Sequence, residues 1–399
     1  MIGARHRVVA PALRIGDAPA AAVFAAARRR GPIARDTVAS VTGLSIATVN
    51  RQVAALLDAG LLRERADLAV SGAIGRPRVP VEVNHEPFLT LGVHIGARTT
   101  SIVATDLFGR TLDAVEMPTP AGNQSSALAA LAGSAQRYLS RWHKRRALWV
   151  GVAVGGVVDS AGGLVDHQRL GWAQAPVGPV LAETLGLPVS VAAHVDAMAG
   201  AELLLGVRRA PSSSLYVYAR ETVGYALQID GRVHSPTSGP GTIANLPVHS
   251  ELLGGTGLLE STVSDEAVLA AARRLGFDPS VRSVAQVLTA ARQGNADAQR
   301  LLTERARVLG EALALLRDLL NPDDLVVGGQ AFTEYPEGMA AVSSAFTRRS
   351  VLAPREIRVT AFGNRVQEAG AGIVSLGGLY ADPLGALRKA SAGRVGATA

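Results

Sequence analysis

The chain has 399 residues, of which 48% are hydrophobic and 18% charged, as in a globular protein with two or three domains. It contains no cysteine, which excludes disulfides, thiolate zinc sites and cysteine nucleophiles. We find no apolar run of membrane-spanning length and no signal-type apolar core in the basic N-terminus, so we expect a cytoplasmic protein without membrane attachment.

The positive charge is concentrated at the N-terminal end. The net charge is +7, and residues 1–84 hold 12 Arg against 6 Asp and Glu, which leaves the rest of the chain almost neutral. A basic segment on a neutral body indicates that the segment meets a polyanion such as nucleic acid. The alternative is a solvated basic surface that binds nothing.

Residues 18–60 have the pattern of three short helices. The first helix is Ala-rich and ends in three Arg at 28–30. A second helix is predicted after Asp36, which we take as its N-cap, and it ends at Gly43. A third helix is predicted from Ser45, its N-cap, to Gly60. A helix, a tight turn and a second helix form the helix-turn-helix arrangement.

The third helix is predicted to enter the major groove of DNA. Val49, Val53 and Leu56 recur at i, i+4 and i+7 and form its inward stripe. Small and polar side chains remain near its outward N-terminal end, where Thr, Asn and Arg can contact base edges or phosphates.

Two short strands are predicted after the helices, within 60–72 and 76–84, and they form a wing. The sequence Gly-Arg-Pro-Arg at 75–78 lies between them, and its two Arg could enter a minor groove or hold phosphates. We therefore predict a winged helix-turn-helix that binds double-stranded DNA. The expected DNA contacts are Arg28, Arg29, Arg30, Ser45, Thr48, Asn50, Arg51, Arg76 and Arg78.

Past Asn84 the pattern changes to strands alternating with helices. Residues 89–112 read as a strand, a Gly turn, a strand and a hairpin, and residues 214–234 repeat this order. Long helical segments separate the two repeats from further buried strands that end in glycines. This order indicates a duplicated α/β architecture.

The order of these motifs resembles the ROK family of repressors, open reading frames and sugar kinases. The resemblance runs through GRPRVPVEVN, LGVHIGARTTSIVATDLFG, WVGVAVGGVVD, HVDAMAGAELLLG, TVGYALQIDGRV, the loop at 241–260 and LLNPDDLVVGG. It implies an actin/hexokinase-like fold, in which two α/β lobes close on a sugar, and a C-terminal helix near the DNA-binding head. The winged helix in front is the mark of the family's repressors.

We therefore expect an α/β protein with an N-terminal winged helix-turn-helix and a two-lobed actin/hexokinase-like ROK domain. The expected division is residues 1–84 for the DNA-binding head, 85–190 for the first lobe, completed by 375–399, and 191–374 for the second lobe.

The phosphate-binding hairpin of the family's kinases is altered here. A kinase of this fold needs an acidic residue and a Gly-Gly-Thr turn, so that backbone N–H groups hold the ATP phosphates. The acid is replaced by His94, which removes a carboxylate that would organise Mg²⁺. Ala97 and Arg98 add side chains where the phosphates would approach. We predict no kinase activity and no cofactor.

The candidate sugar site is only partly retained. The family's general base is the Asp of an Asn-Asp-Ala-Asn sequence, which is Val-Asp-Ala-Met at 195–198 here and keeps Asp196. The family's Gly-Glu-Ile-Gly-His run is Gly-Thr-Ile-Ala-Asn at 241–245, and another sugar-contacting acid matches Glu260. Loss of hydrogen-bonding groups reduces discrimination for a hydroxylated ring. The candidate effector residues, which could equally be a residual polar cluster, are Asn245, Asp196, Glu260 and His194.

The loop at 249–260, HSELLGGTGLLE, keeps the shape of a metal loop without its ligands. The family carries Cys-x-Cys-Gly-x-x-Gly-Cys-x-Glu here and binds zinc with an additional His. The Cys positions are Glu251, Leu253 and Leu258, and the His position is Asn245. We expect no metal, and we expect the leucines to replace it by packing.

The predicted function is a DNA-binding transcriptional regulator that acts as a repressor and senses a sugar or sugar derivative. Its expected partners are an operator, a sugar-like effector and further copies of itself, as a homodimer or a dimer of dimers. One alternative is a constitutive DNA-binding protein whose body only oligomerises. The other is a sugar kinase with a DNA-binding head.

Overall fold

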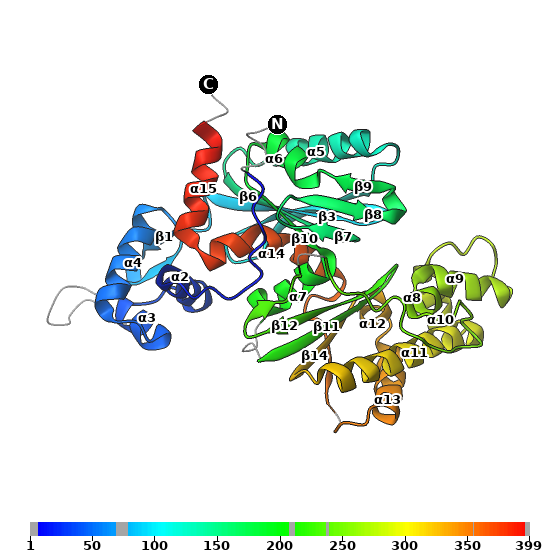
Figure 1. Cartoon of the computed structure of the whole chain (residues 1–399). Helices are drawn as coiled ribbons and strands as arrows, with labels where there is room; N and C mark the ends of the chain where they lie inside the picture. Colours follow the sequence, from blue (N-terminus) through cyan, green and yellow to red (C-terminus); the bar gives the residue numbers. More distant parts are fainter. Residues whose placement is uncertain (1–6, 69–78, 207–211, 237–238, 354, 396–399) are drawn as a thin grey trace. The chain divides into compact units, whose positions relative to one another are not determined.

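The computed structural model describes residues 7–68, 79–206, 212–236, 239–353 and 355–395 (Figure 1). The chain forms two compact units. The first comprises Met1–Leu205, Thr237–Gly239 and Gln367–Ala399, and the second comprises Gly206–Pro236 and Pro240–Val366. The division into three domains with limits at 84 and 190 stays a prediction, since compact units report packing and not independent folding.

The head (residues 1–84) begins with three helices that pack on one another, and their apolar side chains form its core. Gly43 ends the second helix in the left-handed conformation, at φ 70°. The predicted cap at Asp36 is wrong, because that helix begins one residue earlier and Asp36 lies in its first turn. The helices are α2 (Pro19–Arg30), α3 (Arg35–Thr42) and α4 (Ile46–Asp58).

A two-stranded antiparallel sheet follows, as the wing prediction requires. Strands β1 (Leu62–Glu64) and β2 (Val81–Val83) pair with Leu62 opposite Val83. The carboxylate of Glu82 accepts hydrogen bonds from Arg63 at 2.7 Å and Arg65 at 3.0 Å. A short 3-10 helix, η1 (Ala66–Leu68), precedes residues 69–78, which lie outside the described residues.

The rest of the first unit is an α/β layer structure built on a five-stranded sheet of order β10-β6-β3-β4-β5. Strands β3, β4 and β5 form an antiparallel meander, and β6 and β10 continue the sheet in parallel. Helices α5 and α6 contribute to the apolar core with this sheet. The elements are β3 (Phe88–Ile95), β4 (Thr99–Thr105), β5 (Thr111–Pro118), α5 (Gln124–Ser140), β6 (Arg146–Val154), α6 (Val177–Leu185), β10 (Val189–Ala193) and α7 (His194–Leu205).

Two glycines allow a helix to cross the sheet at very short range. A Cβ at Gly151 would lie 2.2 Å from the backbone nitrogen of Ser375, and one at Gly92 would lie 2.8 Å from the backbone of Ala371. Both contacts are to α14 (Val366–Ala381), so only residues without a side chain fit at these two positions. The next helix, α15 (Pro383–Val395), packs against α2, α4 and β6, which confirms the expected place of the C-terminal helix.

A small antiparallel sheet lies between β6 and α6 along the chain. Its strands are β7 (Val157–Asp159), β8 (Leu164–His167) and β9 (Trp172–Ala175), with the 3-10 helix η2 (Gln168–Leu170) before the last strand. His167 is the last residue of β8, and its side chain is buried.

The second unit repeats the sheet topology of the first. Its order is β13-β12-β11-β14-β15, again with three antiparallel strands extended by two parallel ones. The predicted duplication is therefore confirmed. The strands are β11 (Ser213–Ala219), β12 (Val223–Ile229), β13 (Arg232–Val233), β14 (Asp324–Gly328) and β15 (Ile357–Val359).

The helices of the second unit form its core together with the sheet, and the 25-residue α11 contributes more buried side chains to this core than any other helix described in the unit. They are α8 (Leu259–Val263), α9 (Asp265–Arg274), α10 (Val284–Arg292), α11 (Ala296–Leu320), α12 (Gln330–Thr333), η3 (Pro336–Gly338), α13 (Met339–Arg349) and η4 (Gly363–Arg365). In the described part of the chain no helix is both long and apolar enough to cross a membrane.

Candidate functional site

The N-terminus of α4 is fixed by a side-chain cap. The hydroxyl of Ser45 accepts a hydrogen bond from the backbone N–H of Thr48 at 3.2 Å and donates one to the Thr48 hydroxyl at 3.0 Å. This confirms Ser45 as the N-cap. Both hydroxyls were expected to contact DNA, and here they hold the start of the helix in place.

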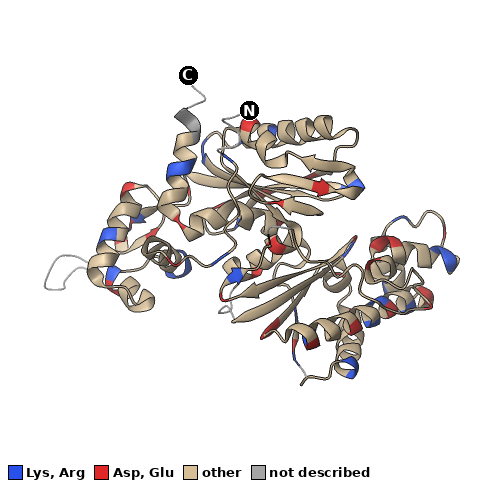
Figure 2. Cartoon of the chain, viewed as in Figure 1, with Lys and Arg blue, Asp and Glu red and all other residues tan. Residues whose placement is uncertain are grey.

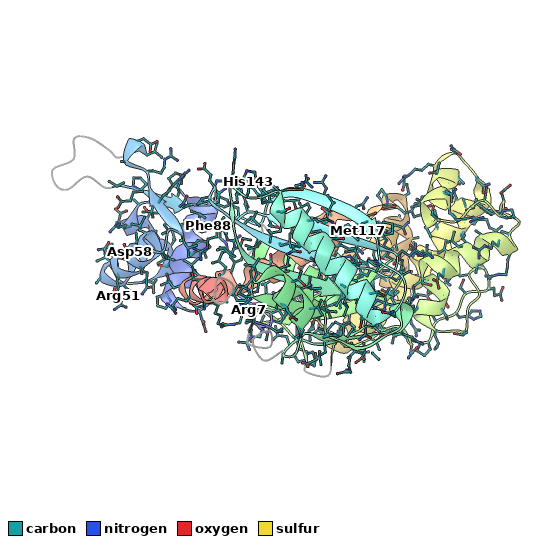
Figure 3. All side chains as sticks on the ribbon, turned by 90° about the horizontal axis from the view of Figure 1, so that it is seen from above. Arg7, Arg51, Asp58, Phe88, Met117 and His143 are labelled. Carbon is teal, nitrogen blue, oxygen red and sulfur yellow. The ribbon has the colours of Figure 1, made fainter. Side chains whose placement is uncertain are left out.

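Beyond the cap, α4 has one buried and one exposed side. Val49, Val53 and Leu56 are fully buried, as their spacing predicts. The side chains of Asn50 and Arg51 are exposed, and within the described residues neither side chain forms a hydrogen bond or ion pair. Figure 3 shows Arg51 at the outer margin of the head. These two side chains are therefore available to bind a partner.

The three Arg that end α2 differ in their surroundings. Arg28 donates a hydrogen bond to the carbonyl oxygen of Leu204 at 3.0 Å, and its guanidinium lies 4.1 Å from the ring centroid of Tyr380. Arg29 and Arg30 are exposed. Figure 2 shows Lys and Arg residues on the helices of the head. Arg28 is thus held by contacts within the first unit. Arg29 and Arg30 are exposed and remain candidates for phosphate contacts. Arg76 and Arg78 lie outside the described residues.

Three histidines come together at the carboxyl edge of the first sheet. His94 is at the end of β3 and His194 begins α7, and their rings stack with centroids 6.2 Å apart and planes 3° apart. A Cβ at Gly155 would lie 3.2 Å from His167 Nε2 and 4.0 Å from His194 Cε1. Gly155 follows β6, so the three adjacent parallel strands β3, β6 and β10 all end at this cluster. Ligands of open α/β sheets bind at such carboxyl ends.

Burial favours the neutral form of the His194 and His167 imidazoles at pH 7. It lowers the pKa of His194 to about 4, and the neighbouring His167 adds to the shift. Burial also lowers the pKa of His167. Neutral imidazoles can each donate one hydrogen bond and accept another, which suits a hydroxylated ligand.

Asp196 lies in the first turn of α7 and is 5% exposed. A carboxylate at this position is favoured by the positive end of the helix dipole. His194 and Asp196 therefore share one helix terminus in the first unit.

The other two candidate effector residues belong to the second unit. Glu260 is in the first turn of α8, where its Oε2 accepts a hydrogen bond from the backbone N–H of Val223 at 3.1 Å. Its own N–H donates to the carbonyl of Ala244 at 3.0 Å, next to the exposed Asn245. The structure thus brings Asn245 and Glu260 close within their unit.

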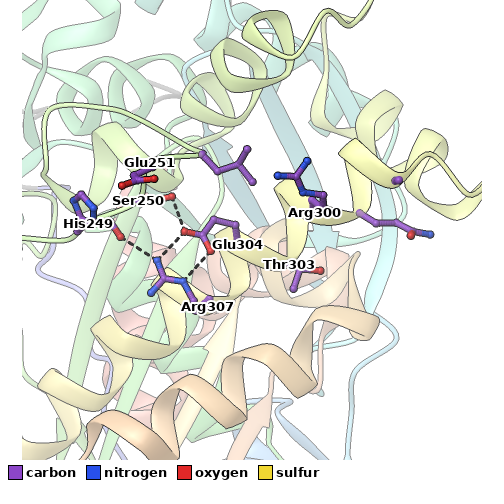
Figure 4. A pocket seen from close by; sticks show the side chains of 10 residues that line it. His249, Ser250, Glu251, Arg300, Thr303, Glu304 and Arg307 are labelled. Atoms are coloured by element: carbon purple, nitrogen blue, oxygen red, sulfur yellow. Dashed lines mark hydrogen bonds and ion pairs between the residues drawn. The ribbon is translucent and has the colours of Figure 1, made fainter.

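The loop at 249–260 is held by a polar network. The Ser250 hydroxyl donates to Glu304 at 2.7 Å, and Arg307 donates to Glu304 at 2.7 Å and to the carbonyl of His249 at 3.0 Å (Figure 4). The Arg307 hydrogen bond lowers the pKa of Glu304 against the opposing effect of burial. These residues and the start of α11 line an open pocket of about 780 Å³.

Leucines complete this loop on its inner side. Leu253 and Leu259 are buried in the core of the second unit, and Leu252 packs against it, so the expected packing of leucines at this loop holds for these residues. Among the described residues, no three His, Asp or Glu side chains are arranged to hold a metal ion.

Two features of this region were not anticipated from the sequence. His167 was not among the predicted site residues, and only the pairing of β8 places it beside His194. Arg28 was grouped with its neighbours as a DNA contact. The aromatic partner that engages it lies more than 350 residues away along the chain, so no local signal could have separated it from Arg29 and Arg30.

The family model described as ROK family matches residues 90–375. The chain is 74% identical over 401 residues to the protein named transcriptional regulator Rv0485 from Mycobacterium tuberculosis (strain ATCC 25618 / H37Rv), covering 97% of this chain and 92% of that protein. It is also 23% identical over 380 residues to the DNA-binding transcriptional repressor Mlc from Escherichia coli (strain K12), covering 90% and 93% of the two chains.

Solved structures give the same fold. A ROK family transcriptional regulator described as a homologue of the E. coli Mlc protein matches with a TM-score of 0.78 at 23% identity, over 93% of this chain and 98% of its own. The ROK hexokinase from Thermus thermophilus matches with a TM-score of 0.59 at 25% identity, over 72% of this chain and 98% of its own.

These comparisons confirm the predicted fold and the prediction of a ROK-type transcriptional regulator. The chain belongs to the ROK family.

Proposed function

We propose that this chain represses transcription by binding an operator through α4 and its wing. The observation that carries the proposal is the outward side of α4, where Asn50 and Arg51 are exposed behind a capped helix start. The basic charge of the head supplies attraction to phosphates. An Asn50→Ala, Arg51→Ala double variant should fold normally and lose specific binding to DNA from its own upstream region. Retained binding would contradict the proposal.

The active form is a homodimer or a dimer of dimers. One recognition helix contacts only a few base pairs, and two copies related by a two-fold axis bind two half-sites of a palindromic operator. Because operator DNA is in the cytoplasm of a bacterial cell, the protein acts there.

The body senses a sugar or sugar derivative. Its candidate contacts are His194 and Asp196 in the first unit and Asn245 and Glu260 in the second. The mechanism is a population shift between two states of the dimer that differ in the spacing of its two heads. The effector binds one of these states more tightly than the other. The altered polar groups imply that common hexoses bind weakly.

Helix α7 supplies a direct connection from His194 and Asp196 to the head. His194 and Asp196 lie in its first turn, and Leu204, near its last residue, accepts the hydrogen bond from Arg28 of α2. Twelve helical residues span about 18 Å. A ligand that shifts the start of α7 therefore changes the contact that α2 makes at its end.

The protein does not transfer phosphate from ATP. His94 occupies the position of the acid that a kinase of this fold requires, and it is buried against His194. The test is ATP consumption by the purified protein with a panel of sugars, with a sugar kinase as the positive control. Sugar-dependent ADP release would contradict this part of the proposal.

A second candidate is an effector-independent regulator whose body only oligomerises. The observation that favours it is the engagement of Glu260 by the backbone of Val223. A thermal-shift screen separates the two, because a ligand at 100 times its Kd stabilises the folded state by about 2.7 kcal/mol. A stabilising sugar supports the sensor, and a uniformly negative screen supports the effector-independent regulator.

A further inference from the structure

The exposed side of α4 begins with an apolar surface. Ile46, the first residue of the helix, is 51% exposed, and Ala47 beside it is also exposed. One turn further along lie the exposed Asn50 and Arg51. Residues at i, i+1, i+4 and i+5 share one side of a helix. Going along α4 from its N-terminus, the outward side therefore presents the methyl groups of Ile46 and Ala47 and then the hydrogen-bonding groups of Asn50 and Arg51.

The cap determines which groups of the first turn can reach a partner. The Ser45 hydroxyl accepts from the Thr48 N–H and donates to the Thr48 hydroxyl. Turning Ser45 outward would break the cap, and turning the Thr48 hydroxyl outward would break the bond between the two hydroxyls. The isoleucine side chain is thus the largest group that the first turn presents. Its position at the helix start also makes it the part of α4 that enters a groove first.

The exposed positive charge of the head favours duplex DNA as the partner of this surface. Arg51 is exposed on the same side of the helix, and α2 ends in the exposed Arg29 and Arg30. A partner must therefore combine negative charge with an apolar group in a groove that accepts a helix. The major groove offers the C5-methyl group of thymine on its floor and phosphates along its edges.

We propose that Ile46 contacts the C5-methyl group of a thymine in each operator half-site, next to the bases that Asn50 and Arg51 contact. This inference rests on the proposed binding of DNA by α4. It makes Ile46 a specificity-determining residue: the contact favours thymine over cytosine and adenine at one position, and it adds no charge and no hydrogen bond.

The test begins with selection of binding sites from random duplex DNA by the full-length protein. Each conserved thymine of the selected site is then replaced by deoxyuridine, which removes only the methyl group. We expect one position per half-site at which uracil weakens binding about fourfold, the effect of burying one methyl-sized group. The Ile46→Ala variant should bind the thymine site more weakly and should no longer distinguish thymine from uracil at that position.

Ile15→Ala is the matched control, because Ile15 is 43% exposed and lies outside the three helices of the head. It should keep the full preference for thymine. An Ile46→Ala variant that retains the wild-type preference, or a specific site indifferent to every uracil substitution, would overturn the inference and leave DNA binding by α4 intact. Failure to select any site would instead count against the proposed function itself.

Discussion

The guanidinium of Arg28 donates a hydrogen bond to the carbonyl oxygen of Leu204, at 3.0 Å, and thereby joins the last turn of α2 to the end of α7. The same guanidinium lies over the ring of Tyr380, whose hydroxyl donates to the carbonyl of Leu107 at 3.0 Å. A cation near a helix C-terminus is stabilised by the helix dipole. Arg28 is thus part of the packing between the head and the first α/β layer.

The Arg28→Ala variant should therefore lose stability. We expect the free energy of unfolding to fall by about 1–3 kcal/mol, because a charge-assisted hydrogen bond and a cation–π contact are both removed. Urea unfolding measures the change, and Arg30→Ala, an exposed neighbour, should alter it by less than about 0.5 kcal/mol. Equal effects of the two substitutions would show that the contact contributes no stability.

The exposed cations of the head should be detected by the salt dependence of DNA binding. Each phosphate contact contributes about 0.9 to the slope of log affinity against log salt concentration. Replacement of Arg30 by Gln should lower this slope by about one contact and weaken binding to all sequences alike. Arg349→Gln, which changes an exposed Arg in the second unit, is the control. An unchanged slope in Arg30→Gln would remove α2 from the DNA interface.

A separate prediction concerns the two Arg expected in the wing. Replacing Arg76 and Arg78 together with Ala should weaken DNA binding without changing the thermal unfolding of the protein. Both residues lie outside the described part of the chain, and the prediction comes from their place between the two wing strands. A double variant with wild-type affinity would exclude the wing from DNA binding.

The buried histidines predict a loss of stability in mild acid. The pKa of His194 is lowered to about 4, whereas an unfolded chain takes up this proton near pH 6.5. Between these values the unfolded state binds more protons, so the free energy of unfolding falls as the pH is lowered from 6.5 towards 4.

Urea unfolding at pH 7 and pH 5 measures this effect, which we expect to be about 1–2 kcal/mol for His194. A His194→Gln variant should show a correspondingly smaller difference between the two pH values. The exposed His143 is changed to Gln as the control. If wild type and His194→Gln respond equally to pH, then His194 is protonated as readily in the folded state as in the unfolded one.

The loop at 249–260 should depend on its polar network and not on a metal. The Arg307→Met variant removes the donor to Glu304 and to the His249 carbonyl, and we expect a loss of about 1–3 kcal/mol. Thr303→Ala, which changes an exposed residue of the same pocket, should have little effect. EDTA should leave the thermal unfolding midpoint unchanged. A lower midpoint in EDTA would reveal a structural metal.

Much of the fold was predictable because its signals are local. The Ser45 cap, the stripe of Val49, Val53 and Leu56, and the two strand–glycine–strand repeats each depend on residues close in sequence. The start of α3 was less certain because Asp36 is as favourable in a first turn as at an N-cap.

The sites were harder to predict because their parts meet only through the topology. His94 and His194 are 100 residues apart, and they stack because β3 and β10 flank β6 in a parallel sheet. The replacement of the zinc ligands was visible in the sequence. The network that now holds the loop was not, since Glu304 and Arg307 come from a helix about 50 residues further along.

The most direct measurement is binding of the purified protein to DNA from its own upstream region, by fluorescence anisotropy, with and without a panel of sugars and sugar derivatives. We predict specific binding that one member of the panel weakens, and loss of that response when Asp196 is changed to Asn. Binding that no sugar alters would contradict the sensor and support an effector-independent regulator. The absence of specific binding would contradict the central claim that this chain is a DNA-binding regulator.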